Sequence, residues 1–301
     1  MVERRTHSAP RRLHLGRSIF TIHFTGARAD SHELEFYDAA HALVGFQRSL
    51  ALVSHLVANG EIITQAPALK NAQIYSLPPE EGGWKTKAAV VFGTMVGGMA
   101  VAPHDSVAGN IAMSIYDYVL SESVGVHVDY NKTIGQQIEA VKTQYPGTTK
   151  LTPSRLDSLV EKCEVAVTEM HRPIVKSETA TEARISVAGE GRDRPFGPTL
   201  TRDTYEYIHF TTRSESPSEM IGRISGYDSN TYKGRVFLSD EGRPVPFELA
   251  QSVRSPLAIQ LITNNLASNA QGRYAKLRFL AFRDVSRTHR LKRVIVVEVY
   301  S

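Results

Sequence analysis

Along the first half of the chain, hydrophobic positions change from an alternating pattern to a helical one. Residues 19–25 alternate as a half-buried strand does, whereas apolar side chains within 31–59 recur every three to four residues. This recurring helix face consists of Leu43, Phe46, Leu50, Val53 and Val57. We expect Asp30 or Ser31 to cap the helix and an Asn-Gly pair to end it. Its apolar face can pack inside the protein or pair with a second subunit.

The middle of the chain predicts a hairpin followed by helices and further strands. Prolines and glycines between Ala72–Leu77 and Trp84–Phe92 are strong turn formers, so these two runs should pair as a hairpin. The other elements that we expect are helices over 106–123 and 152–173, strands over 177–187 and 204–212, and a glycine- and proline-rich loop over 189–200.

The last eighty or so residues predict five strands and one helix. The strands are expected over 220–227, 232–238, 244–249, 274–284 and 292–299. Pro246 should place the third strand at a sheet edge or at a strand end, because proline cannot donate to a sheet ladder. Ser255 before Pro256 is typical of a helix N-terminus, which puts the helix between the third and fourth strands.

This order resembles the oligonucleotide/oligosaccharide-binding (OB) barrel, which has a helix between its third and fourth strands. The resemblance implies ligand contacts at the loops near 228–232 and 285–292. We therefore predict an α+β protein, in which an N-terminal helix-plus-hairpin domain precedes a C-terminal five-stranded OB-like β-barrel. The expected division is a basic disordered arm over 1–17, an acidic α+β domain over 18–188, a linker with a connecting strand over 189–219, and a basic barrel over 220–301.

Charge is distributed unevenly along this predicted architecture. Residues 220–301 hold thirteen Lys and Arg against six Asp and Glu, whereas residues 18–219 hold seventeen against twenty-four. The first seventeen residues add five arginines and a single glutamate. An acidic middle and a basic end would orient the protein on a polyanion.

Basic residues gather at the predicted hairpin between the last two strands. The candidate nucleic-acid contacts are Arg283, Arg287, His289, Arg290, Lys292 and Arg293, with Tyr232 as a stacking residue. Such cations can also form a solvated hairpin tip that protects a sheet edge. We predict a non-enzymatic protein whose barrel binds single-stranded nucleic acid or a phosphorylated nucleotide, while the N-terminal domain mediates assembly or partner contact, including a homo-oligomer through the 31–59 helix.

A membrane effector is the main alternative function. Residues 88–102 are strongly apolar, and Gly93 and Gly97 have the small-xxx-small spacing of packed transmembrane helices. Fifteen residues fall short of the about twenty that span a bilayer as a helix. A buried strand, a glycine-rich turn and a helix start explain the same segment.

An interaction module, or an enzyme whose groups assemble only in space, is the second alternative. The sequence contains no P-loop, nucleophile elbow, paired CxxC or Rossmann fingerprint, so we expect no cofactor and favour a binding protein. A metal site can be drawn from His32, Glu35, Asp38 and His41. These residues lack a recognised ligand spacing, and acids in a first helical turn also favour the helix dipole, so we predict no metal.

The remaining composition bounds the class of protein. A length of 301 residues with 42% hydrophobic residues predicts more than one globular domain. The single cysteine, Cys163, excludes an internal disulfide framework and fits a reducing compartment. The polar, arginine-rich start lacks the apolar stretch of a secretory signal, so we expect a cytoplasmic protein.

Overall fold

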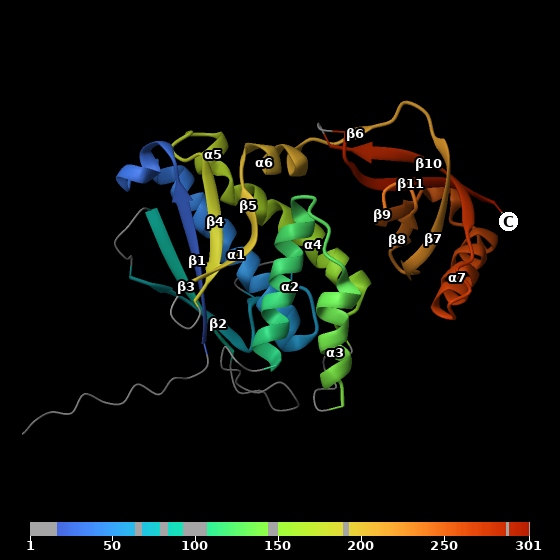
Figure 1. Ribbon diagram of the computed structural model, residues 1–301, viewed down its shortest axis with the longest axis horizontal. Coiled ribbons are helices and arrows are strands. Elements are labelled where there is room, and N and C mark those ends of the chain that lie inside the picture. Colours follow the sequence, from blue (N-terminus) through green and yellow to red (C-terminus); the bar gives the residue numbers. More distant parts are fainter. Residues whose placement is uncertain are drawn as a thin grey trace, which may run out of the picture.

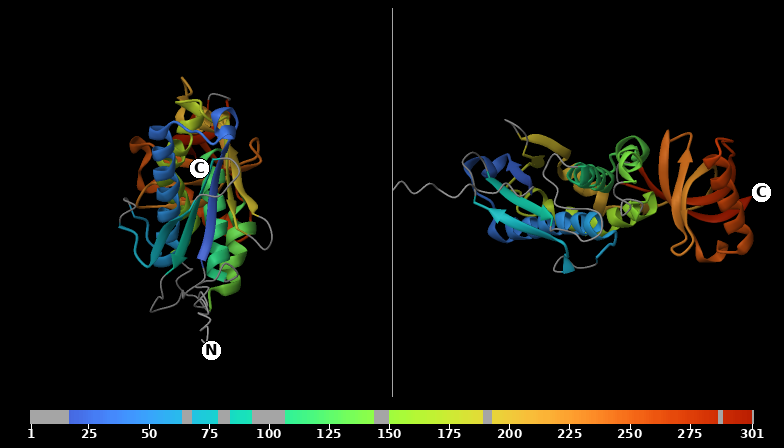
Figure 2. Two further views of the ribbon diagram at one scale, coloured as in Figure 1. Left: turned by 90° about the vertical axis from the view of Figure 1, so that its left-hand side faces the viewer. Right: turned by 90° about the horizontal axis from the view of Figure 1, so that it is seen from below.

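The computed structural model describes residues 17–63, 68–78, 84–92, 107–143, 150–188, 193–286 and 289–300. The molecule is elongated, with a mixed helix-and-sheet part at one end and a β-barrel at the other (Figures 1 and 2). In the first part the strands are β1 (Arg17–Thr25), β2 (Ala72–Leu77), β3 (Trp84–Phe92), β4 (Glu182–Val187) and β5 (Arg194–Leu200). Its helices are α1 (Phe36–Asn59), α2 (Val107–Ser123), α3 (Gln136–Val141), α4 (Pro153–Met170), α5 (Arg172–Val175) and α6 (Arg202–His209).

The five strands of this part form one antiparallel sheet in the order β2-β3-β1-β4-β5. Every second residue of the central strand β1, from Phe20 through Ile22 to Phe24, is buried in a core shared with the helices. The alternation of the sequence therefore has its expected cause: one face of the strand is covered by helices.

Helix α1 buries its apolar stripe within the same chain. Phe46, Leu50 and Val53 are each at most 3% exposed in the core. A Cβ on Gly45 would come within 2.4 Å of the carbonyl oxygen of Ala166, so the absence of a side chain lets α1 and α4 approach closely. The predicted stripe is thus a packing surface inside the monomer.

The start of α1 differs from the sequence prediction. Residues 27–31 form a short 3₁₀ turn, and His32 follows in the left-handed conformation with φ 64°. The helix begins at Phe36, where the Glu35 carboxylate accepts a hydrogen bond from the Asp38 amide at 2.8 Å. The candidates Asp30 and Ser31 therefore cap nothing on α1, because the chain changes direction between them and the helix.

The stretch 189–219, predicted as a linker with a connecting strand, contains more structure than expected. Its described part holds β5, which pairs with β4, and α6 (Figure 1). The strand predicted over 204–212 is wrong, because Thr201 and Thr204 form a capping box that starts a helix at Arg202. The alternating pattern there arises from a helix with no fully buried residue, in which residues 204–208 are half-buried. The strand predicted over 177–187 is shorter than expected and begins at Glu182.

The C-terminal part is a closed five-stranded barrel, as the sequence predicted. Its strands are β7 (Ser218–Asp228), β8 (Lys233–Leu238), β9 (Arg243–Leu249), β10 (Leu277–Val285) and β11 (Leu291–Tyr300), with the short β6 (Thr212–Arg213) added beside β10. The order β7-β8-β9-β11-β10 closes because β10 also pairs with β7, and β9 runs parallel to β11. Helix α7 (Pro256–Ala270) lies between the third and fourth strands, capped by Ser255 as predicted. The fold is therefore α+β with an OB-like barrel.

The position of Pro246 explains how a proline fits inside a closed barrel. Strand β9 pairs with β8 over nearly its whole length. Its parallel pairing with β11 begins only at Phe247, one residue after Pro246. Pro246, like Pro244 before it, thus occupies the part of β9 whose second side has no ladder, and Pro246 lines the cavity shared with α4.

Candidate functional site

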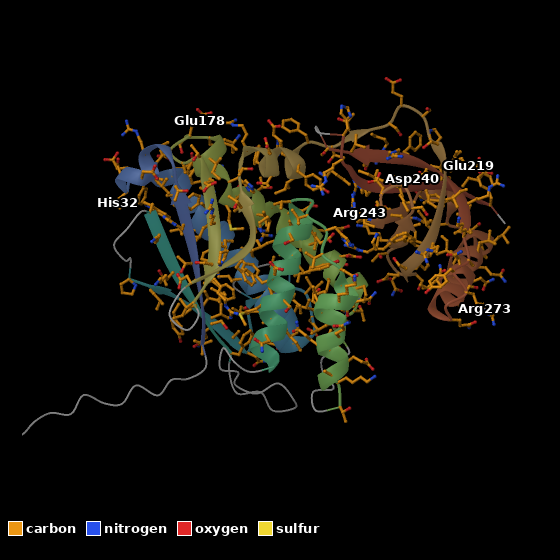
Figure 3. All side chains as sticks on the ribbon, viewed as in Figure 1. His32, Glu178, Glu219, Asp240, Arg243 and Arg273 are labelled. Carbon is orange, nitrogen blue, oxygen red and sulfur yellow. The ribbon has the colours of Figure 1, made fainter. Side chains whose placement is uncertain are left out.

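The outer face of β8 and β9 is turned toward α4 and α6. Side chains alternate along β8, so Val236 and Leu238 fill the barrel core while Lys233 and Arg235 point outward. Figure 3 places Arg243, at the start of β9, on this same side of the barrel, whereas Arg273 lies on the far side. In OB-type barrels this is the face on which ligands bind.

Arg235 lies at the centre of the contact between the two parts. Its side chain is 9% exposed, and its guanidinium donates from Nε to Oδ1 of Asp157 on α4 at 2.7 Å, with Nη2 2.5 Å from the same oxygen. Nη2 also donates to Glu122 at the end of α2, at 3.3 Å, and the guanidinium stacks 5.8 Å from the Tyr118 ring centre. Burial alone would lower the pKa of Arg235, but Tyr118 and Asp157 raise it above its ordinary value. The barrel is thus anchored by a buried, permanently charged arginine.

Two neighbouring groups, His127 and the Val128 amide, fix the position of the Glu122 carboxylate. Its Oε1 accepts from the Val128 amide at 2.9 Å and lies 2.7 Å from Nδ1 of His127. Burial opposes ionisation, but the hydrogen bond from His127 and the charge of Arg235 hold the pKa of Glu122 below its ordinary value. The carboxylate is therefore charged at neutral pH.

A second group of contacts surrounds this central pair. Lys233 donates to both carboxylate oxygens of Glu161 at 2.8 and 2.9 Å. Lys292 donates to the Ile208 carbonyl at 3.1 Å and to the Thr211 hydroxyl at 2.7 Å, and lies 5.3 Å from the ring centre of Tyr207. Burial lowers the pKa of Lys292.

The same desolvation acts on the acidic side of the contact. Burial raises the pKa of Glu164, an effect that the charge of Lys292 offsets in part. Asp157, Glu161 and Glu164 stand three or four residues apart on α4, so one helix face presents all three carboxyl groups to the barrel. We call this contact surface the charged interface. It consists of β8, β9 and the start of β11 on the barrel and of the acids of α4 opposite them.

The charged interface encloses a cavity of about 180 Å³. Its described lining contains four cations, Arg235, Arg243, Lys292 and Arg293, and four acids, Glu122, Asp157, Glu161 and Glu164. Small-molecule pockets usually measure about 300–1,000 Å³. A charge-balanced cavity of this size cannot hold a nucleotide while the barrel is docked on α4.

Comparison with known families places both parts of the chain. The sequence model of a family described as a domain of unknown function, DUF7946, matches residues 20–209. The protein belongs to this family. A second family of unknown function, DUF7947, matches residues 216–300, which hold the barrel. No curated protein and no solved structure matches the chain.

Within the DUF7947 match, several of the predicted contact cations are engaged by the protein itself. Arg283 donates to Glu241 at 3.0 Å and Arg293 donates to Asp284 at 2.8 Å. Asp284, which is 1% exposed, also accepts two bonds from Arg213, and these two arginines hold its pKa down against the effect of burial. These cations join the β10–β11 hairpin internally and to its neighbours β6 and the β8–β9 turn.

The other predicted residues are arranged differently. The guanidinium of Arg290, an exposed residue, lies 5.9 Å from the Tyr207 ring centre. His289 is exposed with φ 58°, and Arg287 lies outside the described residues. Tyr232 lies away from this group, half-buried, with the guanidinium of Arg254 4.6 Å from its ring centre. The structure thus brings Arg290 and Lys292 together around one ring and leaves Tyr232 apart.

Sequence reasoning missed the acidic half of the charged interface and its central arginine. The spacing of Asp157, Glu161 and Glu164 on a predicted helix was a readable signal, as was the opposite charge of the two parts. Nothing in the local sequence distinguishes Arg235 from the exposed arginines around it.

The residues of the metal hypothesis and of the membrane alternative lie outside the charged interface. Asp38 accepts from Arg172 at 2.9 Å and His41 lies 2.7 Å from Glu169, and the described residues hold no cluster suited to a metal ion. Residues 88–92 form the end of β3, and 93–102 lie outside the described residues. No helix among the residues described has the length and apolar character needed to cross a bilayer.

Proposed function

We propose that the barrel binds single-stranded nucleic acid or a phosphorylated nucleotide on the face formed by β8, β9 and the β10–β11 hairpin. The observation that carries this proposal is the charged interface. The basic face that an OB-type barrel uses for its ligand is occupied by a row of carboxylates on α4. A surface that pairs with a row of anions on a helix has the charge and spacing to pair with phosphates.

Under this proposal the phosphates of the nucleic acid compete with the carboxylates of α4 for the same cations of the barrel. The acids of α4 recur at steps of roughly 5–6 Å along the helix axis, and a polyanion displaces them by offering phosphates to the same cations. Both contacts are ionic, yet only nucleic acid releases condensed counterions when it binds, so its affinity falls steeply with salt. Arg290 is exposed beside the half-buried Tyr207 ring, and we expect a strand to make its first contact there.

Fluorescence anisotropy tests this function with labelled single-stranded DNA, single-stranded RNA and duplex DNA at two salt concentrations. The double variant Arg290→Glu/Lys292→Glu should lose binding and its salt dependence, because two phosphate contacts are reversed. Arg273→Glu/Lys276→Glu, on two exposed residues between α7 and β10, is the charge-matched control and should bind as the wild type does. Arg273 lies on the far side of the barrel from α4.

Neutralising the competing acids makes the test independent of how tightly the parts are docked. Glu161→Gln/Glu164→Gln removes two carboxylates from the charged interface and should strengthen binding by about tenfold, the equivalent of about 1.4 kcal/mol of lost competition. If this variant binds none of the three nucleic acids at low salt, the proposed function is wrong.

The same proposal assigns partner contact or assembly to the N-terminal part, acting in a reducing, cytoplasmic setting. Phe36 is 87% exposed, Tyr37 59% and Val44 61%, all in the first half of α1. Exposed apolar residues grouped in this way are typical of interaction surfaces. Sedimentation velocity of Phe36→Ser/Val44→Ser tests it: assembly through α1 should weaken, whereas Ile221→Ser, half-exposed on the barrel, should change nothing.

A further inference from the structure

A cleft of about 610 Å³ opens at the end of α2 that lies away from the charged interface. Its described lining comes from α2, α3, the end of β4 and the start of β5. Figure 1 shows how these elements are arranged. Its volume falls within the range of small-molecule sites, about 300–1,000 Å³. Neither the barrel nor its cations contribute to the described lining.

One wall of this cleft is polar and follows a single face of α2. Asn110, Ser114 and Asp117 stand four and three residues apart, so their side chains line up along the helix. Gln137 of α3 faces them, and its Nε2 donates to the Ser114 hydroxyl at 2.9 Å. The Oε1 atom of Gln137 is buried and has no hydrogen-bond partner among the described residues.

Asp117 supplies a second acceptor. Its Oδ1 accepts a hydrogen bond from the Gly197 amide at 2.9 Å, where the backbone has φ +66°. Burial raises the pKa of this carboxyl group. A buried acceptor without a partner costs about 1–3 kcal/mol, so the polar wall favours a ligand that presents hydrogen-bond donors.

The opposite wall is apolar and flat, and the mouth is basic. Phe196 stacks on Tyr116, with ring centres 5.5 Å apart and planes at 23°, and meets Phe20 edge-on at 5.7 Å. These contacts hold the Phe196 ring in place beside Met113 and Val187. Arg194, two residues earlier on β5, is exposed at the rim.

We propose that this cleft binds a purine nucleotide, with guanine preferred. The base lies against Phe196, its adjacent ring N–H and exocyclic amine donate to Asp117 and Gln137, and the phosphate meets Arg194. Adenine presents an acceptor where guanine presents its ring N–H, so a carboxylate discriminates against it. The cleft is separate from the charged interface, and its occupancy does not depend on the barrel binding nucleic acid.

Isothermal titration of the full chain with GMP, AMP and guanosine tests this assignment. GMP should bind at least ~10-fold more tightly than AMP, because a site whose polar groups are acceptors rejects a ligand that lacks the matching donor. Guanosine should bind more weakly than GMP. Arg194→Ala should reduce the affinity for GMP and leave that for guanosine unchanged.

Two variants keep the test independent of folding. Asp117→Asn retains an oxygen for the Gly197 amide and should lower GMP affinity about tenfold, since a charge-assisted bond becomes a neutral one. Gln137→Leu should lower it as well, and Asp129→Asn, a half-exposed carboxylate after α2, is the matched control. Equal binding of GMP by the wild type and by Asp117→Asn overturns the proposal. GMP binding that Arg290→Glu/Lys292→Glu abolishes would instead assign the nucleotide to the barrel.

Discussion

At the scale of single residues, one buried guanidinium lies at the centre of the contact between the barrel and the helices. Arg235 lies between Asp157 and Glu122, whose side chains are 22% and 8% exposed. A buried ion pair contributes little net stability when compared with well-packed apolar residues. Loss of one partner is costly, because the other charge then remains buried without compensation.

We therefore expect Arg235→Met to lower the free energy of unfolding by about 3 kcal/mol, because Asp157 and Glu122 lose the cation that balances their buried charge. Urea unfolding followed by circular dichroism measures the change. Arg278→Met is the control: its bond to Glu219 is 2.8 Å long, but both side chains are more than half exposed, and such pairs contribute less than about 1 kcal/mol. Equal losses in the two variants would show that Arg235 is no anchor.

His171 gives the protein a dependence on pH. It is fully buried, with Nδ1 donating to the Val167 carbonyl and Nε2 accepting from the Thr204 hydroxyl, and burial lowers its pKa from 6.5 to about 4. The unfolded chain takes up a proton near pH 6.5 and the folded chain near pH 4. Stability is thus retained above pH 6.5 and falls by up to about 1.4 kcal/mol per pH unit as the pH drops toward 4.

The measurement is the free energy of unfolding between pH 7 and pH 4.5. His171→Gln should reduce the slope against pH by up to one proton, and the exposed His209→Gln should leave it unchanged. Burial also lowers the pKa of His23 and of His55, so part of the slope remains in the variant. An unaltered slope in His171→Gln would contradict the assignment.

At the scale of elements, α6 shows how a short helix joins the two parts. Its first turn is closed by Thr204, whose hydroxyl accepts from the Thr201 amide at 2.7 Å and lies 2.8 Å from Nε2 of His171. The helix then carries Tyr207 and the Ile208 carbonyl to Lys292. The capping box thus positions the wall of the charged interface.

Thr204→Val should destabilise the protein by about 1–2 kcal/mol, because the amide of Thr201 and the ring of His171 lose their shared partner while the volume is kept. Thr204→Ser retains the hydroxyl and should be close to wild type. Thermal unfolding of the two variants at equal pH separates them. A loss of the same size in the serine variant would point to packing of the methyl group instead.

At the scale of the whole molecule, the acidic and basic halves neutralise each other where they meet. The polarity in the sequence, which we interpreted as a surface for a polyanion, is used in part between the two halves of one chain. Exposed pairs of this interface, such as Lys233 with Glu161, are screened by salt, whereas the buried Arg235 contacts are screened much less.

Raising the salt concentration should therefore loosen the docked barrel without unfolding it. Small-angle X-ray scattering should show a larger radius of gyration for Glu161→Gln/Glu164→Gln than for the wild type at low salt, and the difference should shrink as salt increases. Circular dichroism should remain unchanged. A radius that is the same in both proteins at every salt concentration would mean that these two acids do not hold the barrel.

The sequence by itself determined those elements whose signals lie within a few residues. The hairpin Ala72–Leu77 and Trp84–Phe92, the helix beginning after Ser255, and the barrel strands follow from periodicity, turn residues and caps. The same local reasoning failed at α6, where a half-buried helix has the alternating pattern of a strand, and at the start of α1.

Only the tertiary structure decided which charges meet. Arg235 bonds Asp157 and Glu122, which lie 78 and 113 residues away along the chain, and Asp117 meets Gly197 across 80 residues. A pattern in the sequence reports the face on which a side chain lies, because that depends on neighbours in the chain. The partner of that side chain depends on how distant elements dock. The sequence therefore predicted a basic barrel and an acidic middle, and only the fold brought the two into contact.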